Sequence, residues 1–302
     1  MNIKQLEPQY HEAWNTFCLD NNWFWHTTHW LDYQQNAQIG VEIKDHSFFM
    51  EQDGKIISIV PLVQDGNQLI STGFEDRKEI LAEVNRIALE NDIKRVQVNS
   101  DIKEYLSIDG YTCVLDLSDI KPTKGHRAAI KKGAAYLTYH ETNDIWKFRE
   151  DYFEVAGKVT RPRRTFELLG EWINLGYGLL LEALFEGKTA GYTYILCYKN
   201  RAYYFMSCVF PECRQYDVSH YLQSVAFDLL RRRGVSHYDL GEQVYDSLTC
   251  QPSDKERNIS LFKRGFSSNI IRSPASEYFF CPSYMRQIYQ ERINNYIDAE
   301  YK

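Results

Sequence analysis

The sequence predicts an α/β protein made of two tandem units, each a mixed β-sheet flanked by helices. Two observations carry this prediction. Apolar segments with the period of strands alternate with amphipathic helical segments along the chain. The order of these segments in the first half then recurs in the second half, as expected of a duplicated unit. We expect a first unit over residues 1–120 and a second over residues 121–302.

The first unit is expected to begin with a helix and a dense aromatic cluster. Apolar and aromatic residues recur three or four positions apart from Leu6 to Phe17, as on one helix face. The next segment, residues 23–30, contains the cluster, including Trp23 and Trp25. It either seals the helix onto a sheet or forms a substrate-binding wall, because such rings can stack on a base or a sugar.

A hairpin, a helix and two more strands complete the first unit. Asp53–Gly54 is typical of a two-residue hairpin turn. Asp76 is expected to start the helix, because Glu79 three residues later completes a capping-box pattern. The expected strands are residues 48–52, 55–63, 96–98 and 113–117.

The second unit is expected to follow the same plan after a linker and a basic helix. Ser219 begins its strongest amphipathic helix, which Gly234 ends. Two further helices are expected at residues 142–158 and 165–175, and strands at 179–185, 191–197, 203–209, 236–241 and 277–280, before a tail helix.

The duplication prediction depends on three pairs of corresponding segments. Each pair has the same place between the same kinds of element. The pairs are Asp53–Lys55 with Glu186–Lys188, Asn91–Lys94 with Arg232–Val235, and Leu106–Thr112 with Leu261–Ser267.

The composition is that of an ordinary folded protein with a negative net charge. Of 302 residues, 44% are hydrophobic and 25% charged, and the formal net charge is −6. Nucleic-acid binding depends on clustered positive charge, so this balance argues against a DNA-binding protein. The chain lacks a signal-peptide pattern and any apolar run of about 18 residues, which predicts a cytoplasmic protein without a membrane span. Seven scattered cysteines without a Cys-x-x-Cys pair predict no metal site.

Three motifs give a resemblance to a known family. They are Arg127–Gly133, Tyr238–Gly241 and Ile259–Phe266. In this order and spacing they resemble the FemAB-like branch of the GNAT acyltransferases, in which two GNAT units are joined in tandem. The resemblance implies an N-acyltransferase in which an amine attacks a thioester directly, without a covalent enzyme intermediate.

The resemblance also implies a coenzyme A site in the second unit. In this family the fourth strand parts from the fifth and its backbone holds the pantetheine arm, while the next loop and helix N-terminus hold the pyrophosphate. A helix N-terminus offers N–H donors and a positive dipole end to an anion. The loop from Arg214 contains no glycine, unlike that of many GNAT enzymes. The corresponding positions are Met206, Ser207, Cys208, Val209, Arg214, Gln215, Tyr216, Ser219 and His220.

Four residues are candidates for catalysis. Glu182 is an acid among apolar strand residues, which would suit a general base or a salt-bridged strand residue. Asp239 ends a strand and would contact substrate or brace a loop. By the resemblance, Tyr245 would protonate the departing thiolate. Lys263 occupies the basic position of the family's Phe-Lys-x-Gly-Phe motif and would contact a substrate phosphate or developing charge, or lie on the surface.

The acceptor site is predicted from aromatic and basic residues. Glu242 follows Asp239 at the carboxyl end of its strand, where ligand crevices open. Arg161, Arg163 and Arg164 surround Pro162 and form either a solvated turn or a phosphate site. Trp23 and Trp25 would contact the acceptor ring.

The predicted function is acyl-CoA-dependent N-acylation of an amino sugar, plausibly nucleotide-linked and destined for a surface glycan. One alternative is an aminoacyl-tRNA-dependent peptidoglycan ligase, which the acidic balance and the lack of a long helical arm disfavour. Another is a non-catalytic GNAT-like binding module. No metal is expected.

Overall fold

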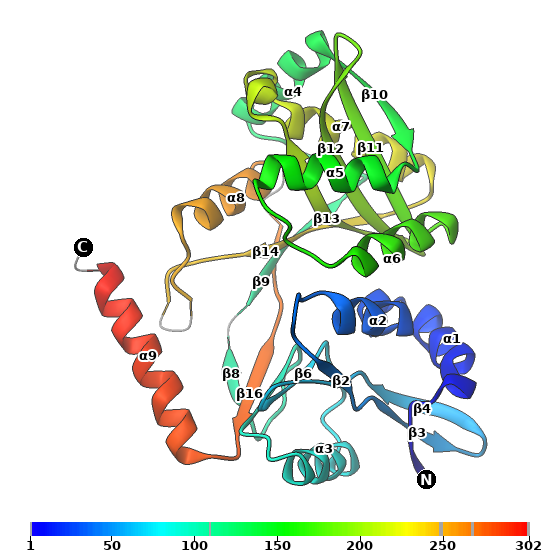
Figure 1. The fold of residues 1–302 in the computed structure, drawn as a ribbon, viewed down its shortest axis with the longest axis vertical. Helices are drawn as coiled ribbons and strands as arrows, with labels where there is room; N and C mark the ends of the chain where they lie inside the picture. Colours follow the sequence, from blue (N-terminus) through cyan, green and yellow to red (C-terminus); the bar gives the residue numbers. More distant parts are fainter. Residues whose placement is uncertain (1, 109, 248–249, 267–268, 301–302) are drawn as a thin grey trace. The chain divides into compact units, whose positions relative to one another are not determined.

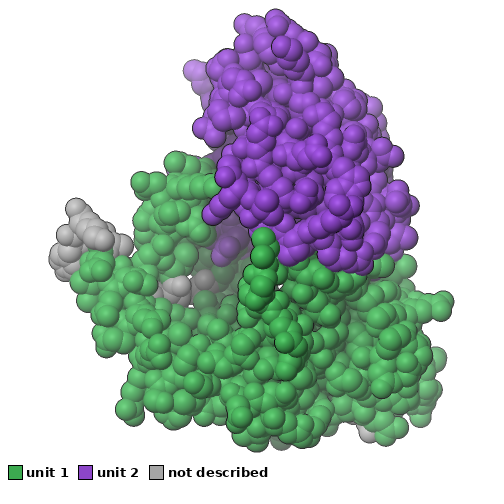
Figure 2. Space-filling model, in the orientation of Figure 1, with its two compact units in different colours: residues 1–111, 244–259, 272–302 green, residues 112–243, 260–271 purple. Residues whose placement is uncertain are grey.

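The computed structural model describes residues 2–108, 110–247, 250–266 and 269–300 (Figure 1). Its contacts divide the chain into two compact units, each assembled from separate segments (Figure 2). Unit 1 comprises residues 1–111, 244–259 and 272–302, and unit 2 comprises residues 112–243 and 260–271.

Unit 1 contains a three-stranded antiparallel sheet, ordered β1-β3-β4, and a six-stranded mixed sheet, ordered β2-β5-β6-β7-β16-β8. Helices α1 and α2 lie on one side of these sheets and α3 on the other (Figure 1). Its elements are β1 (Asn2–Gln5), α1 (His11–Asn21), α2 (Thr28–Asn36), β2 (Ile43–Asp45), β3 (Phe48–Gln52), β4 (Lys55–Val60), β5 (Val63–Asp65), β6 (Gln68–Ser71), α3 (Lys78–Glu90), β7 (Arg95–Val98), β8 (Leu106–Ile108), β16 (Ala275–Phe279) and α9 (Pro282–Glu300).

Two local expectations for unit 1 are wrong. The strand expected over residues 55–63 is broken into β4 and β5 at Pro61, because proline has no N–H to give to a ladder. The capping box is also absent: α3 has Arg77 at its N-cap with no side-chain cap. Asp76 Oδ2 instead accepts the Lys103 N–H at 3.1 Å.

Unit 2 is built on a seven-stranded mixed sheet, ordered β10-β11-β12-β13-β14-β9-β15. Helices α5 and α6 cover one face and α7 the other (Figure 1). Its elements are β9 (Tyr111–Asp116), α4 (Lys124–Tyr136), β10 (Leu137–Thr142), α5 (Ile145–Ala156), α6 (Arg163–Asn174), β11 (Gly178–Phe185), β12 (Lys188–Tyr198), β13 (Arg201–Val209), α7 (Val218–Arg232), β14 (His237–Gln243), the end of α8 (Asp254–Arg264) and β15 (Ile270–Arg272).

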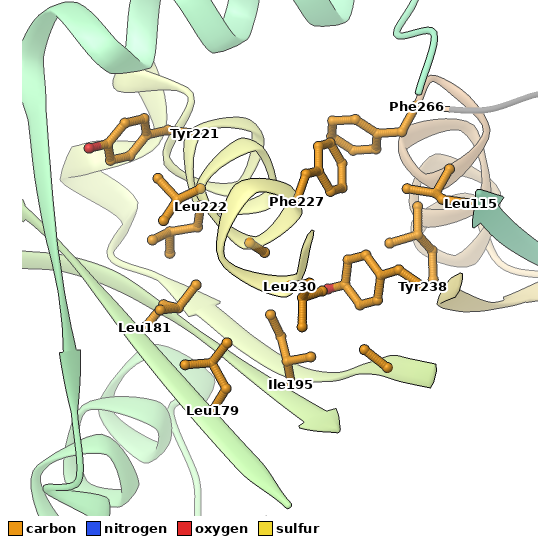
Figure 3. Packing of buried hydrophobic residues seen from close by; sticks show 14 of the residues in the cluster. Leu115, Leu179, Leu181, Ile195, Tyr221, Leu222, Phe227, Leu230, Tyr238 and Phe266 are labelled. Atoms are coloured by element: carbon orange, nitrogen blue, oxygen red, sulfur yellow. The ribbon is translucent and has the colours of Figure 1, made fainter. Parts of the chain in front are cut away.

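The main core of unit 2 lies between α7 and the sheet. Leu222 and Leu230 of α7 are fully buried. Figure 3 shows both side chains directed toward the apolar side chains of β11 and β12, including Leu181 and Ile195. This packing fixes the N-terminus of α7 relative to the strands beside it.

Each sheet is completed by a strand from the other half of the chain. In unit 1, β16 lies between β7 and β8, while in unit 2, β9 lies between β14 and β15. The predicted division at residue 120 differs from the observed units for this reason. Residues 272–302 belong with the first half of the chain.

Of the three repeat correspondences, one is confirmed, one holds after a shift of one residue and one is wrong. The hairpin turns Asp53–Gly54 and Glu186–Gly187 share left-handed backbone angles, with φ of 52° and 76° in one and 50° and 78° in the other. The helix-to-strand turns each contain one residue of positive φ, but Asp92 is the second residue of its segment and Gly234 is the third of its own. The third correspondence is wrong: Leu106–Ile108 is a strand, whereas Leu261–Arg264 ends a helix. Asp109 and Ser267 lie outside the described residues.

Candidate functional site

Strands β13 and β14 are parallel neighbours that separate partway along. Their pairing runs from Arg201 with His237 to Tyr203 with Asp239, and β13 then continues to Val209. A β-bulge at Phe205 follows the last pair, because Ile195 lies opposite Tyr204 and Tyr194 opposite Met206. A bulge bends its strand, so it accounts for the separation. We call residues 206–209, beyond this bulge, the β13 slot.

On the side away from β14, β13 packs closely against β12, and β12 in turn packs against α7. A Cβ atom on Gly191 would lie 2.5 Å from the Cys208 carbonyl oxygen and 3.2 Å from Val218 Cγ1. Only glycine fits such an approach. The predicted pantetheine positions Met206, Ser207, Cys208 and Val209 therefore lie on a rigidly backed strand.

The N-terminus of α7 follows the slot after one short helix, η3 (Pro211–Tyr216). Its N-cap, Asp217, has φ of 56° and makes no side-chain cap, and its first turn holds no acidic residue. The first N–H groups of a helix have no intrahelical acceptor, so this end can receive an anion. The Asp217 carboxylate is itself 3.3 Å from Lys132 Nζ, which offsets its charge.

Helix α4 packs tightly beside this helix end. A Cβ atom on Gly133 would lie 2.7 Å from Tyr221 Cβ and 3.2 Å from the Tyr216 carbonyl oxygen. The basic side chains of α4 are exposed: Lys124, Arg127, Lys131 and Lys132.

The predicted pyrophosphate residues divide into two groups. Arg214 and Gln215 are exposed and Ser219 is half-buried. Tyr216 instead stacks on Phe185, with ring centroids 4.1 Å apart, and so contributes to packing.

His220 has an aromatic environment. Its ring lies 4.6 Å from that of His126 and 5.0 Å from that of Phe262. Burial, together with the charge on His126, lowers the pKa of His220. The neutral ring can therefore donate one hydrogen bond to an anion without carrying a charge.

A row of polar side chains crosses the sheet from the edge strand β10 to the slot. His140, Glu182, Tyr192 and Cys208 are successive cross-strand partners on β10, β11, β12 and β13. The Tyr192 hydroxyl lies 3.1 Å from Glu182 Oε1, and His140 Nε2 lies 3.1 Å from Glu182 Oε2. We call these four residues the polar row.

Helix α5 and Thr189 complete the hydrogen bonding of this row. Tyr192 also lies 2.8 Å from Asp151 Oδ2, to which Lys147 donates at 2.6 Å. Thr189 donates to Glu182 Oε1 at 2.6 Å. Glu182, Tyr192 and Asp151 are buried, whereas the His140 side chain is 48% exposed. The row therefore connects a buried site to solvent.

The Cys208 thiol, which lies in the β13 slot, is neutral. Burial raises the pKa of Cys208 to about 12, so its thiol stays protonated near neutral pH. Burial and the hydrogen bond to Asp151 also raise the pKa of Tyr192. A protonated thiol is a weak nucleophile.

Sequence reasoning identified Glu182 and Cys208 in this row but missed His140, Tyr192 and the neighbouring Asp151. The hairpin gave only part of the signal for Tyr192. Counting from the Glu186–Gly187 turn places Gly191 opposite Glu182, and the extra residue Ala190 in β12 shifts the partner to Tyr192. Asp151 comes from a helix, and only the tertiary structure brings it to the row.

Asp239 and Lys263 brace the end of β14. Thr112 donates to Asp239 Oδ1 at 2.5 Å and the Gly241 N–H at 2.7 Å, while Lys263 Nζ donates to the Glu242 carbonyl at 3.1 Å. Burial raises the pKa of Asp239 and lowers the pKa of Lys263. The Glu242 side chain is exposed. These contacts match the bracing alternative for Asp239.

Two predicted arginines carry acidic partners on their own helix. Arg163 Nε lies 3.1 Å from Glu167, and Arg164 donates to Glu171 at 2.7 Å. Arg161 is half-buried in the bend before them. Both arginines lie in the first turn of α6, and their charges are already paired within that helix.

The remaining predicted site residues belong to unit 1. Tyr245 is 38% exposed, with its ring 5.5 Å from that of Tyr111. Trp25 packs edge-on against Trp30 at 4.6 Å. Trp23 lines a pocket within unit 1.

The described residues contain no group of three or more His, Cys, Asp or Glu side chains suited to a metal ion. Nor does any described helix have both the length and the apolar character needed to cross a membrane.

Comparison with known proteins identifies the fold. The family of acetyltransferase (GNAT) domains matches residues 143–246. The structure of FemX is similar with a TM-score of 0.67 and 13% identity, covering 96% of this chain and all of FemX (100%). A search of curated proteins by sequence finds no match.

Two further solved structures share this fold. One is the C-terminal domain of a protein assigned as a lysylphosphatidylglycerol synthetase from Agrobacterium fabrum, with a TM-score of 0.60, 10% identity and coverage of 89% and 91% of the two chains. The other is a tandem GNAT protein of clavulanic acid biosynthesis, with a TM-score of 0.51, 12% identity and coverage of 93% and 99%. The chain thus has the FemAB-like tandem GNAT fold, and its residues 143–246 match the family of acetyltransferase (GNAT) domains.

Proposed function

We propose that the protein is an N-acyltransferase that takes its acyl group from a coenzyme A thioester held by unit 2. The observation that carries this proposal is the separation of β13 from β14 immediately after Tyr203 and Asp239. A strand that leaves its neighbour presents backbone N–H and C=O groups along its edge. The amide-rich pantetheine arm can pair with these groups as an added strand would.

The end of α7 supports the same donor. Coenzyme A carries a pyrophosphate, and a helix N-terminus attracts such an anion through its N–H groups and its dipole. Exposed Arg214 adds a full charge, and half-buried Ser219 adds a hydroxyl. We assign Met206–Val209 to the pantetheine arm, and Arg214, Gln215, Ser219 and His220 to the pyrophosphate.

The chemical step is direct attack of an amine on the thioester carbonyl. The carbon–nitrogen bond forms, the carbon–sulfur bond breaks, and the amine loses one proton while the departing thiolate gains one. We assign the proton's departure to the polar row, through Tyr192 and Glu182 to half-exposed His140. Tyr245 stays a prediction for protonation of the thiolate.

We further propose that the acceptor is the primary amine of an amino sugar, plausibly nucleotide-linked. The support is chemical: attack on a thioester without an enzyme nucleophile requires a free amine, and unit 1 contains a pocket partly lined by Trp23. The acceptor contacts expected of Glu242, Arg161 and Trp25 stay predictions.

A calorimetric titration with coenzyme A tests the donor proposal. We expect one molecule bound per chain, in unit 2. Ser219→Asp should weaken binding by about tenfold or more, because its carboxylate would repel the pyrophosphate. The helix itself gains from an acid in its first turn, so protein stability should be kept. Ser219→Asn is the neutral control of the same size.

Three outcomes would contradict the proposal. The first is no binding of coenzyme A to the wild-type chain. The second is equal weakening by Ser219→Asp and Ser219→Asn, which would remove the electrostatic explanation. The third is unchanged affinity in both variants, which would place any bound coenzyme A elsewhere.

An aminoacyl-tRNA donor is a second candidate, and one observation favours it. Helix α4 exposes Lys124, Arg127, Lys131 and Lys132 beside the end of α7. A basic helix attracts a phosphate backbone despite an acidic overall charge. Replacing Lys124 and Lys131 by Gln should then reduce turnover and its dependence on salt, and ribonuclease should abolish turnover. Ribonuclease-resistant acyl transfer from acyl-CoA would exclude this candidate.

A further inference from the structure

His126 lies in the first turn of α4 and joins that helix to the end of α8 within unit 2. Its Nε2 atom lies 2.9 Å from the Phe262 carbonyl oxygen, and its Nδ1 atom lies 3.1 Å from Thr123 Oγ1. A carbonyl oxygen can only accept a hydrogen bond, so Nε2 carries a proton and donates it. The backbone adds a second link, because the Thr123 N–H donates to the Gly265 carbonyl at 2.8 Å. These bonds fix the place of the imidazole ring.

Gly265 lies directly against this ring. A Cβ atom on Gly265 would lie 1.9 Å from His126 Cε1 and 2.1 Å from His126 Nε2, far inside van der Waals contact. The φ of Gly265 lies outside the left-handed region, so the position uses the missing side chain and not the backbone freedom of glycine. Gly265 belongs to the Ile259–Phe266 motif, and His126 directly precedes the Arg127–Gly133 motif. Their contact therefore links two motifs that the sequence analysis singled out.

His126 in turn contacts His220, the residue of the first turn of α7 that we assign to the pyrophosphate. The two ring centroids are 4.6 Å apart and the ring planes make an angle of 73°. Phe262 and Phe266 contact both imidazoles, with centroid distances between 4.6 and 6.0 Å. The His220 side chain is 21% exposed, so most of it is enclosed. We call these four residues the histidine cluster.

Two ionisable groups act on His220. The Asp217 carboxylate, 4.0 Å from His220 Nδ1, favours the charged ring, whereas burial and charge on His126 disfavour it. Burial has the largest effect, and the pKa of His220 is lowered. Helix α8 presents only an aromatic ring to His220, that of Phe262. His126 is therefore the cationic group that adjusts the charge of His220, as well as a ring that packs against it.

We propose that His126 is a positioning residue of the coenzyme A site, which holds the His220 ring where it can hydrogen-bond the pyrophosphate, and that Gly265 makes room for His126. The inference rests on the proposed function for the assignment of His220. His126 acts through His220 and does not itself need to contact the donor. The glycine of the Ile259–Phe266 motif then has a steric role in donor binding.

A double-mutant cycle with calorimetric titration of coenzyme A tests this proposal. Gly265→Ala displaces the His126 ring and His126→Ala removes it, so each should weaken binding about fivefold. In the double variant the added methyl group meets no ring, so binding should be no weaker than in His126→Ala alone. Gly125→Ala, in the same turn of α4, is the control, because a Cβ atom there has nothing within 4 Å. Losses that multiply in the double variant, or a Gly265→Ala that matches the control, would overturn the proposal.

A pH titration of the histidine ring signals by NMR, without ligand, gives a readout that a loss of stability would not imitate. His126→Phe keeps an aromatic ring but removes the charge that disfavours protonated His220, so it should raise the pKa of His220. The chain has eight histidines, and the His220 signal is identified by its absence from the spectrum of His220→Gln. An unchanged or lowered pKa of His220 would overturn the contact between the two rings.

Inorganic pyrophosphate as a second probe separates this inference from the donor proposal. Suppose that pyrophosphate shifts the His220 signal, that His126→Ala weakens its binding, and that coenzyme A does not bind. The positioning role would then be upheld and the proposed donor refuted. Coenzyme A binding that neither His126→Ala nor Gly265→Ala weakens would do the reverse. Binding of neither probe would overturn both proposals.

Discussion

The hairpins β3–β4 of unit 1 and β11–β12 of unit 2 have the same backbone and different side chains. Both turn through two residues of positive φ, and both shift register at the residue three positions before the turn. At the next pair, unit 1 has Phe49 opposite Ile59, and unit 2 has Glu182 opposite Tyr192. All four side chains are buried.

This difference teaches that the fold does not require the polar pair. An apolar pair fills the same position in unit 1, and burying polar groups costs stability unless they are paired. The same contrast appears at the parallel strands. Strands β6 and β7 stay paired from Gln68 to Ser71 along all of β6, whereas β13 and β14 part after three pairs. The polar pair and the early separation of β13 from β14 are therefore features of unit 2 that the fold itself does not require.

The largest expected effect concerns the strand that each unit takes from the other half of the chain. In unit 1, Glu277 of β16 is fully buried and binds Arg95 at 2.6 Å and Arg292 at 2.7 Å. Glu277→Gln should lower the free energy of unfolding by about 3–5 kcal/mol, because it leaves two arginines without their partner. Urea denaturation measures this, with exposed Glu291→Gln on α9 as control. If Glu277→Gln lowered the free energy of unfolding no more than the control, the ion pairs of Glu277 would not stabilise β16 in its sheet.

The second prediction breaks the polar row that distinguishes unit 2. Glu182→Gln should reduce turnover about 100-fold at saturating donor, because the row then lacks its proton acceptor. Coenzyme A affinity should not change. Steady-state kinetics give the turnover and calorimetry gives the affinity. Exposed Glu150→Gln on α5 is the matched control, and undiminished turnover in Glu182→Gln would show that the row is structural.

The third prediction compares the loops that follow the two parallel pairs. Arg214→Ala should weaken coenzyme A binding about tenfold, and the effect should shrink at high salt. Arg77, in the corresponding loop of unit 1, is already paired with Glu75. Arg77→Ala should therefore leave the affinity unchanged in the same titration. Similar losses of coenzyme A affinity in both variants would contradict the assignment of the donor site to unit 2.

The smallest expected effect is on the pH dependence of protein stability. Glu277 of unit 1 and Asp239 of unit 2 should contribute to it with opposite signs. Burial alone would raise the pKa of Glu277, but hydrogen bonds and charge from Arg292, with the charge of Arg95, hold it below its ordinary value. Its stabilisation is therefore complete above its unfolded-state pKa and is lost as the pH falls. Burial raises the pKa of Asp239, so its contribution is complete at low pH and is lost as the pH rises.

Urea midpoints between about pH 4 and about pH 7 measure these slopes. The difference between wild type and Glu277→Gln should grow with pH. The difference between wild type and Asp239→Asn, a variant that keeps an acceptor for Thr112 and Gly241, should change in the other direction. Parallel slopes would contradict the assignment of both groups.

Local patterns predicted the hairpins and the helix-to-strand turns, because these depend on neighbouring residues. They did not predict α8, whose residues are mostly polar and of which only Ser260 is buried among those described. Nor did they predict that β16 joins the sheet of unit 1 and β9 that of unit 2. Pairing between distant segments leaves no local signal. The same limit applies to the site: Glu182 was found from its strand, whereas Asp151 and His140 reach it through the tertiary structure.

The place of β16 between β7 and β8 has a consequence for synthesis. A ribosome makes residues 1–111 well before residues 275–279, so the six-stranded sheet stays incomplete while all of unit 2 is being translated. During that interval, β7 presents an unpaired edge to the cell, which is a hazard for aggregation. Unit 2 already has β9 when its own strands emerge. The second half of the chain is therefore expected to finish folding before the first.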